Sequence, residues 1–476
     1  MLRFFPFKLI EVFFIVLFTA LFFASVALNL PNFMLIMLIL FFCCIVALAL
    51  KQSGTELLLG FLVTFFVYLL GRYTVLLFAG ENWFGSFSIN TAKCIVVCLF
   101  LSLLFVYLGF HIMPSRSIDN SDLLNYEEYA KGCNRVKTIS KYVFYLTILF
   151  SIIENLEAAV FVQANSYVSY YTSFSSNLPS IVIRMSKVSD FAFFIFIATL
   201  PSKKELKGPV VLFLLSSCIT FFSGSRGGIV NSILFTFLYY LFRSHNENNP
   251  SVKWITKSTK ILMFAMLPFA IVFLSIYNTL RNDVLNYTGF FGELLTFFVD
   301  QGGSANVIGY TELYKDTLPD SNVSYFFGPI ISFFKYGTIG RLFTGAEAIK
   351  NNTVEMALYG NNLGATISYY VMPNGWTSGL GLGTQYIAEA YADFGYMGVI
   401  IFNFILGILI RKSTFIYHKS WIVNALYINV IMFILRMPRN NALSFVPELI
   451  SLSNWTLIIL VLLLSRSVMI SKKANN

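Results

Sequence analysis

The stretch FFSGSRGGIV, residues 221–230, places one arginine among serines and glycines between two apolar runs. Glycines let backbone N–H groups approach an anion, and a guanidinium binds phosphate oxygens through two parallel hydrogen bonds. A helix that starts here would add the positive end of its dipole. The stretch therefore predicts a phosphate or pyrophosphate site that includes Arg226 and Gly227. The alternative is a tight turn between two helices.

Carboxylates supply the second kind of chemistry that the sequence offers. The candidates are Asp283, Glu293, Asp300, Glu312, Glu347, Glu389 and Asp393. A carboxylate is the usual base for a hydroxyl group, and we predict Glu389 and Asp300 as the catalytic residues. Glu389 and Asp393 stand four residues apart in AEAYAD, on one face of a helix entering an apolar run, where charge is costly and indicates function. The alternative is that both cap this helix by binding its first amides.

Most of the chain must lie in a lipid bilayer. Of its 476 residues, 57% are hydrophobic, 17% aromatic and 12% charged, and the mean hydropathy is +0.73. A soluble globular protein does not have this composition. Apolar runs of about 20 residues or somewhat fewer predict about twelve transmembrane helices. They lie at residues 9–29, 33–50, 57–79, 94–113, 142–163, 187–200, 208–222, 228–242, 261–280, 394–410, 421–436 and 454–470.

The positive residues predict the orientation of these helices. About two thirds of all Lys and Arg fall in alternate connections if both termini are cytoplasmic, as the preference of basic residues for the cytoplasmic side requires. This distribution accounts for the net charge of +10 without nucleic acid. The first run, although rich in small residues near FASVA, is long and is followed at once by a second, so we expect a signal anchor rather than a cleaved signal peptide.

Some arginines remain on the predicted outer side, where this distribution does not explain them. They are Arg184, Arg226, Arg281, Arg341, Arg436 and Arg439, with Arg72 inside the third predicted span. One alternative is that each side chain extends to lipid headgroups. We predict instead that the six outer arginines and Gly227 bind the pyrophosphate or another part of the substrate.

A long outer loop separates two groups of helices. We expect residues 1–280 to hold nine transmembrane helices, residues 281–393 to form a partly helical cap over an outward cavity, and residues 394–476 to hold three more helices and a cytoplasmic tail, all in one membrane domain. Loops of this length are usually functional. The run FFGPIISFF within it is too short to span, so we expect it at the membrane interface.

The chain resembles the O-antigen polysaccharide polymerases of the Wzy type. The resemblance rests on SGSRGGIV at the start of a span, on a long outer loop that opens after LRND and contains DQGGSANVIGY, and on GLGTQYIAEAYADFGYMGVIIFNFILGILI at residues 381–410. It implies a GT-C-like glycosyltransferase of the bacterial inner membrane that acts at the periplasmic face. Such an enzyme transfers a growing glycan from undecaprenyl pyrophosphate to the non-reducing end of the next lipid-linked repeat unit.

The resemblance also implies partners and excludes cofactors. The partners are the lipid-linked donor and acceptor, the bilayer and a chain-length regulator in the membrane. Neither a metal, nor a soluble cofactor, nor nucleic acid is expected. The cysteines lie in apolar runs or in a predicted cytoplasmic loop, where none is placed for a disulfide or a metal site; they are Cys43, Cys44, Cys94, Cys98, Cys133 and Cys218.

Two other functions fit a membrane protein of this size. O-antigen ligases look similar but are described with a histidine in the large outer loop, whereas His111, His245 and His418 map here to cytoplasmic ends or loops. A flippase or another transporter of lipid-linked oligosaccharide would usually show internal repeats, and no self-similar halves are visible. The sequence favours a polymerase, and it leaves the sugars, the linkage, the stereochemistry, the oligomeric state and the identity of the base open.

Overall fold

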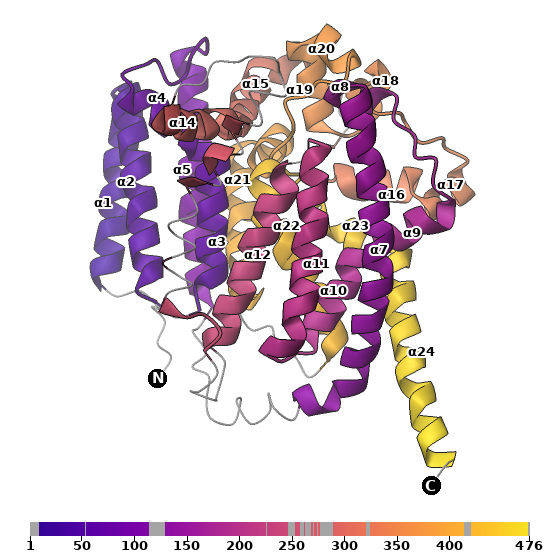
Figure 1. Cartoon of the computed structure of the whole chain (residues 1–476). Coiled ribbons are helices and arrows are strands. Elements are labelled where there is room, and N and C mark those ends of the chain that lie inside the picture. Colours follow the sequence, from indigo (N-terminus) through magenta and orange to yellow (C-terminus); the bar gives the residue numbers. More distant parts are fainter. Residues whose placement is uncertain are drawn as a thin grey trace. The chain divides into compact units, whose positions relative to one another are not determined.

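The computed structural model describes the chain in segments that form two compact units (Figure 1). The described residues are 9–52, 54–113, 129–224, 226–245, 253–257, 261, 268–269, 271–273, 275–276, 289–319, 324–413 and 420–474. Unit 1 comprises Met1–Ser115, Lys257–Thr414 and Ile434–Ser444. Unit 2 comprises Arg116–Thr256, Phe415–Phe433 and Phe445–Asn476.

The elements of unit 1 are helices throughout its described part. They are α1 (Leu9–Ala27), α2 (Pro31–Leu50), α3 (Glu56–Phe65), the π-helix η1 (Phe66–Leu70), α4 (Gly71–Phe78), α5 (Ile89–Ile112), α14 (Gly289–Gln301), η2 (Gly302–Ala305), α15 (Asn306–Tyr314), η3 (Lys315–Thr317), α16 (Gly328–Tyr336), α17 (Thr338–Thr344), α18 (Val354–Tyr359), α19 (Leu363–Val371), α20 (Pro373–Thr377), α21 (Tyr386–Ser413) and η4 (Met437–Arg439).

Unit 2 is helical over its described residues as well. Its helices are α7 (Asn134–Ala164), α8 (Tyr167–Thr172), α9 (Ser180–Lys187), α10 (Ser189–Ala198), α11 (Lys203–Phe222), α12 (Arg226–His245), α23 (Phe445–Leu449) and α24 (Leu452–Ala474). The helix α22 (Trp421–Arg436) belongs to unit 2 up to Phe433 and ends in unit 1.

Eight helical segments are long and apolar enough to cross a membrane, as expected for a multi-pass membrane protein. They are Pro31–Leu50, Glu56–Phe78, Ile89–Ile112, Asn134–Ala164, Lys203–Phe222, Tyr386–Ser413, Trp421–Arg439 and Phe445–Ser465. A shorter apolar helix covers Glu11–Ala27. Of the other predicted spans, α12 has twenty residues but is not among the eight, and the span at 261–280 lies mostly outside the described residues.

The span predicted at residues 187–200 differs in the structure. The helix α10 there has ten residues, about 15 Å in length and so about half of the hydrocarbon core. Every side chain from Phe191 to Ala198 is at most 3% exposed. This run is apolar because it is buried inside unit 2, and a continuous apolar pattern does not distinguish a buried core helix from a lipid-facing one.

Two helices of unit 1, α5 and α21, approach so closely that glycines are required between them. A Cβ at Gly109 would collide with the carbonyl of Phe404, and a Cβ at Gly407 would collide with the carbonyl of Val106. Beside these contacts, Ser102 donates a hydrogen bond to the Asn403 side chain. Small residues and interhelical hydrogen bonds are the usual means of packing membrane helices. This packing fixes α21, which carries the predicted catalytic Glu389.

The helix α21 is interrupted at Gly395, whose backbone angles are φ 60° and ψ −153°. Positive φ is easily adopted only by glycine. The sequence predicted a span that starts near residue 394, and the structure adds a short helix, Tyr386–Phe394, before it. Both carboxylates of AEAYAD lie on this short helix, ahead of the kink.

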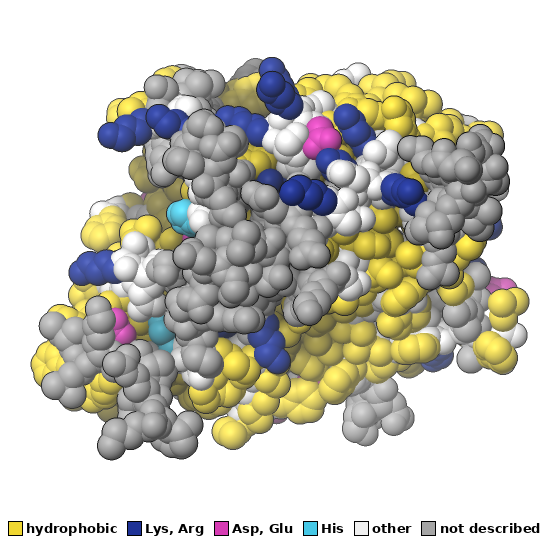
Figure 2. All heavy atoms as spheres, turned by 90° about the horizontal axis from the view of Figure 1, so that it is seen from below, with side chains coloured by type: hydrophobic (Ala, Val, Ile, Leu, Met, Phe, Trp, Pro, Cys, Tyr) yellow, Lys and Arg dark blue, Asp and Glu magenta, His cyan; other side chains and the backbone are white. Residues whose placement is uncertain are grey.

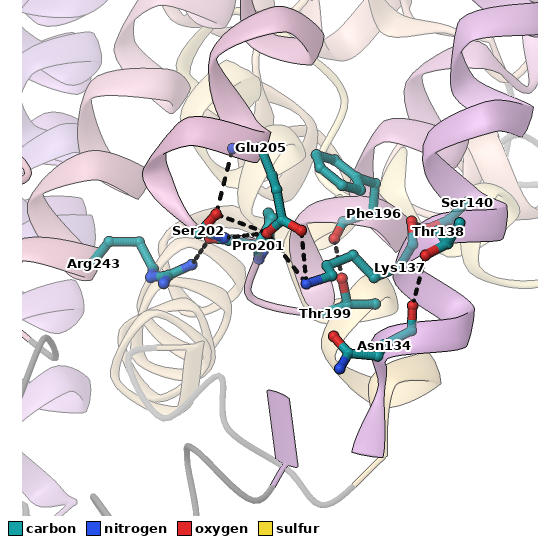
Figure 3. A network of polar contacts seen from close by, with 10 residues as sticks. All are labelled: Asn134, Lys137, Thr138, Ser140, Phe196, Thr199, Pro201, Ser202, Glu205 and Arg243. Atoms are coloured by element: carbon teal, nitrogen blue, oxygen red, sulfur yellow. Dashed lines mark hydrogen bonds and ion pairs between the residues drawn. The ribbon is translucent and has the colours of Figure 1, made fainter. Parts of the chain in front are cut away.

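Unit 2 has a charged turn between α10 and α11 (Figure 3). Ser202 and Glu205 form a capping box at the start of α11, and the Glu205 carboxylate lies 2.9 Å from the Lys137 ammonium. Arg243 donates to the Pro201 carbonyl at 2.8 Å. The face drawn in Figure 2 likewise carries many Lys and Arg side chains and few carboxylates. The cytoplasmic location of the basic connections stays a prediction.

Candidate functional site

Segments far apart in the sequence meet in unit 1 around the DQGG motif of residues 300–303. A Cβ at Gly302 would come within 2.6 Å of the Arg72 backbone nitrogen, so the chain packs directly against α4. The Arg72 guanidinium donates to the Val299 carbonyl at 3.2 Å, and the Tyr73 hydroxyl donates to the Asn306 side chain at 2.9 Å. These contacts hold the end of α14 and the turn η2 in place.

Glu389 is fully buried, with 0% of its surface exposed. Its carboxylate accepts hydrogen bonds from the Thr384 hydroxyl at 2.9 Å, the Asn441 amide group at 2.5 Å and the Ala442 backbone N–H at 2.8 Å. A buried carboxylate is tolerated when hydrogen bonds compensate its lost hydration. In this arrangement Glu389 fastens residues 441–442 to the start of α21.

Asp393 has the same kind of role toward another segment. It accepts hydrogen bonds from the Ser324 hydroxyl at 2.7 Å and the Phe326 N–H at 2.9 Å. The alternative that Glu389 and Asp393 cap their own helix is therefore wrong, because both carboxylates bind backbone amides of distant segments. Sequence spacing could indicate a helix face, but not which segment would pack on it.

The segment RMPRNNA, residues 436–442, forms the basic side of the site, and we call it the arginine strip. Arg439 donates to the Gln301 side chain, and its guanidinium lies 5.7 Å from the centre of the Tyr68 ring. The Nε of Arg436 is buried and has no hydrogen-bond partner among the described residues. Within the described part of the chain, neither arginine forms an ion pair with a carboxylate.

The electrostatic consequence is a pair of positive charges, neither of which is paired with a carboxylate of the residues that the structure describes. Glu389 anchors the arginine strip through Asn441 and Ala442 and pairs with neither arginine. Guanidinium groups held in place, at a site that is partly shielded from water, bind phosphate groups strongly. The arginine strip can therefore take an anion without first breaking an ion pair.

The other predicted site residues lie elsewhere or lack a described side chain. Asp300 is exposed and directly precedes Gln301, the partner of Arg439, whereas Arg341 is exposed on α17. In unit 2, Arg184 is exposed on α9, and α12 begins at Arg226 as predicted. The side chain of Arg226 and the whole of Arg281 lie outside the described residues.

The structure adds residues that the sequence did not single out, namely Gln301, Asn441 and Gln385. Gln385 is fully buried at the start of α21, and its Nε2 has no partner among the residues that the structure describes. Gln301 and Asn441 lie 138 and 52 positions from the residues that they contact. Only their proximity to DQGG and to two arginines could have drawn attention to them. Over the described segments, no three His, Cys, Asp or Glu side chains group as metal ligands.

The helices define a multi-pass membrane protein, in which the arginine strip is anchored to a buried carboxylate. The sequence model of the family O-antigen polysaccharide polymerase Wzy matches residues 10–472. Because this match covers nearly the whole chain, the chain belongs to that family. Family members polymerise O-antigen from lipid-linked oligosaccharide repeat units in the membrane, which is a glycosyltransferase-type activity. No curated protein and no solved structure matches the chain.

Proposed function

We propose that this chain polymerises undecaprenyl-pyrophosphate-linked repeat units at the periplasmic face of the bacterial inner membrane. It transfers the growing glycan to the non-reducing end of an incoming lipid-linked unit. The observation that carries the proposal is the arginine strip, in which Gln301 holds the Arg439 guanidinium and neither Arg436 nor Arg439 is paired with a carboxylate of the described segments. A lipid pyrophosphate has the chemistry that such a strip binds.

The reaction needs stabilisation of a leaving group more than it needs a strong nucleophile. The bond between the anomeric carbon of the growing glycan and a pyrophosphate oxygen breaks, and a bond to an acceptor hydroxyl oxygen forms. Negative charge develops on the departing pyrophosphate, where preorganised donors are most effective. Arg436 and Arg439 supply these donors in the proposed mechanism.

The acceptor hydroxyl must also lose its proton. Of the two carboxylates predicted as catalytic, Asp300 is exposed, whereas Glu389 is fully buried and binds three donors. We assign the base to Asp300, because a base must reach the proton that it removes. Glu389 is then a positioning residue that holds the arginine strip through Asn441 and Ala442.

The proposed orientation places both termini in the cytoplasm and the arginine strip toward the periplasm. Cysteine labelling tests it at two exposed positions, Lys204 in unit 2 and Glu355 in unit 1. Lys204→Cys should react only after the membrane is opened, and Glu355→Cys should react in intact spheroplasts. Reaction of Lys204→Cys from outside would reverse the orientation.

The function is tested by the lipopolysaccharide of a strain that lacks this chain. A polymerase defect leaves lipid A-core that carries a single repeat, because ligation continues. Bare core would indicate a ligase, and the absence of any repeat outside the cell would indicate a flippase. We expect the single-repeat band, with the full ladder restored by the chain on a plasmid. In strains that also lack a chain-length regulator, a restored ladder with an altered distribution of chain lengths would support that regulator as a partner.

A further inference from the structure

The helices α16 and α17 form a tightly folded hairpin, residues 328–344, which we call the loop hairpin. A Cβ at Gly337 would collide with the carbonyl of Phe333, and a Cβ at Gly340 would collide with the carbonyl of Phe334. These glycines let α17 fold back onto α16 with backbone in contact. The loop hairpin is therefore held in one shape by its own packing.

The base of the loop hairpin is anchored at the kink of α21. Asp393 binds the Ser324 hydroxyl and the Phe326 N–H just before α16. The Phe326 ring lies 5.7 Å from the ring of Phe394 and 5.1 Å from the ring of Phe402. Phe402 lies seven residues beyond the kink at Gly395, about 10 Å along the second part of α21. Phe326 therefore contacts the apolar part of a helix long enough to span a membrane.

The loop hairpin exposes large apolar side chains. Phe334 is 59% exposed, Leu342 is 81% exposed and Phe343 is 86% exposed. Lys335 and Arg341, the neighbours of these residues in sequence, are exposed as well. The nine residues of α16 extend over about 14 Å, too short to cross a bilayer.

We infer that the loop hairpin docks on the phospholipid leaflet at the Gly395 end of α21. Phe334, Leu342 and Phe343 enter the boundary between headgroups and acyl chains, and Lys335 and Arg341 lie at the lipid phosphates. A short helix with apolar side chains and adjacent cations is typical of a segment lying in the membrane interface. The contacts of Phe326 join the start of α16 to the apolar part of α21, which argues for lipid over a soluble partner. This surface does not depend on the proposed polymerase activity.

Photo-crosslinking of the full chain in its own membranes tests the inference. The photoreactive residue p-benzoylphenylalanine replaces Phe343, and the matched control replaces Tyr359, which is aromatic, 63% exposed and in the same unit. Mass spectrometry after irradiation should detect phospholipid adducts at position 343 and none above background at position 359. Addition of Arg341→Glu should lower the share of anionic phospholipid among the adducts at position 343, because anionic headgroups are attracted by basic residues.

Several outcomes would overturn the inference. Phospholipid adducts at both positions in equal amount would show that position 343 has no special contact with lipid. A dominant adduct with a second copy of this chain or with another protein would make the loop hairpin a protein interface. A dominant adduct with the polyprenyl carrier would assign the surface to the substrate instead of the phospholipid. Polymerase activity can persist under each of these outcomes, so they leave the proposed function standing.

Discussion

The arginine strip of unit 1 and the GSRGG stretch of unit 2 both offer arginine to a phosphate group, but the contacts around them differ. In the strip, hydrogen bonds that Glu389 and Gln301 accept fix the backbone and one guanidinium. In GSRGG, α12 starts at Arg226, and a Cβ added at Gly227 would meet only Asn231, at 4.0 Å. The strip is held by the protein, whereas Gly227 is not required by the packing of its described neighbours.

The difference concerns what each site can do before a ligand arrives. A preorganised group stabilises developing charge without further rearrangement, so the strip suits the leaving pyrophosphate. Backbone with room around it can instead approach an anion once that anion is bound. We therefore expect substitutions in the strip to slow the reaction more strongly than substitutions at GSRGG.

The largest effect should follow from Arg439→Ala. This change removes a charge, the hydrogen bond to Gln301 and the contact with Tyr68. We expect polymerisation to fall by on the order of 100-fold or more, as for other preorganised donors. Arg439→Lys should recover only part of this loss, because lysine lacks the bidentate fork. Lipopolysaccharide ladders at matched protein level measure the loss, and Lys350→Ala, at an exposed lysine elsewhere in unit 1, is the control. A full ladder from Arg439→Ala would remove the strip from the reaction.

Asp300→Asn tests the assignment of the base. Loss of a general base should lower kcat by about 100-fold with little change in KM. The rates are compared at matched protein level. The measurement is the rate of elongation of lipid-linked units by the purified chain. A change in KM alone would show that Asp300 binds substrate and does not remove the proton.

Glu389→Gln should slow polymerisation less than Asp300→Asn does. Its effect should come from the loosened arginine strip. An amide cannot replace the carboxylate at every donor, so at least one hydrogen bond is lost, and we expect roughly a tenfold slower reaction. The change should be non-additive with Asn441→Ala, because both act on the same contact. Effects that multiply in the double variant would show that Glu389 acts on the substrate independently of the strip.

Gly302→Ala tests whether packing holds the DQGG motif beside the arginine strip, and the measured quantity is the stability of the fold. Its methyl group would collide with Arg72, whereas a Cβ at Gly303 would meet nothing within 4 Å. We expect Gly302→Ala to lower the unfolding temperature, since overpacking usually costs about 1–3 kcal/mol. Gly303→Ala is the matched control and should unfold as the wild type does. Equal unfolding temperatures for the two variants would show that η2 can move away from α4.

The smallest effect should come from Gly227→Ala, whose methyl group would meet no described atom closer than 4.0 Å. We expect unchanged protein level and a few-fold shortening of the ladder if an anion approaches the backbone at GSRGG, because the methyl group then intrudes on the ligand. Arg226→Ala should shorten the ladder more than Arg226→Lys, but less than Arg439→Ala does. Normal ladders from Gly227→Ala and Arg226→Ala together would reduce GSRGG to a turn between α11 and α12.

The sequence predicted the helical class and most spans because apolar length is a local property. It predicted a helix start near GSRGG, with a span from residue 228, and α12 begins two residues earlier, at Arg226. Local pattern could not separate the buried α10 from a span, since burial in protein and burial in lipid select the same side chains. The partners of Glu389 could not be predicted from the sequence either, because Asn441 and Ala442 meet it only through the packing of α21 against a distant turn.

The central claim is that the arginine strip makes this chain an elongating transferase. The direct measurement uses the purified full chain in nanodiscs with lipid-linked single repeat units taken from a strain that lacks the chain. We expect the wild-type chain to form products of two or more repeats that remain on the pyrophosphate carrier, with one carrier pyrophosphate released for each linkage. We also expect no elongation by the variant that combines Arg436→Ala and Arg439→Ala at normal folding. Elongation by that variant, or transfer by the wild type only to added lipid A-core, would contradict the central claim.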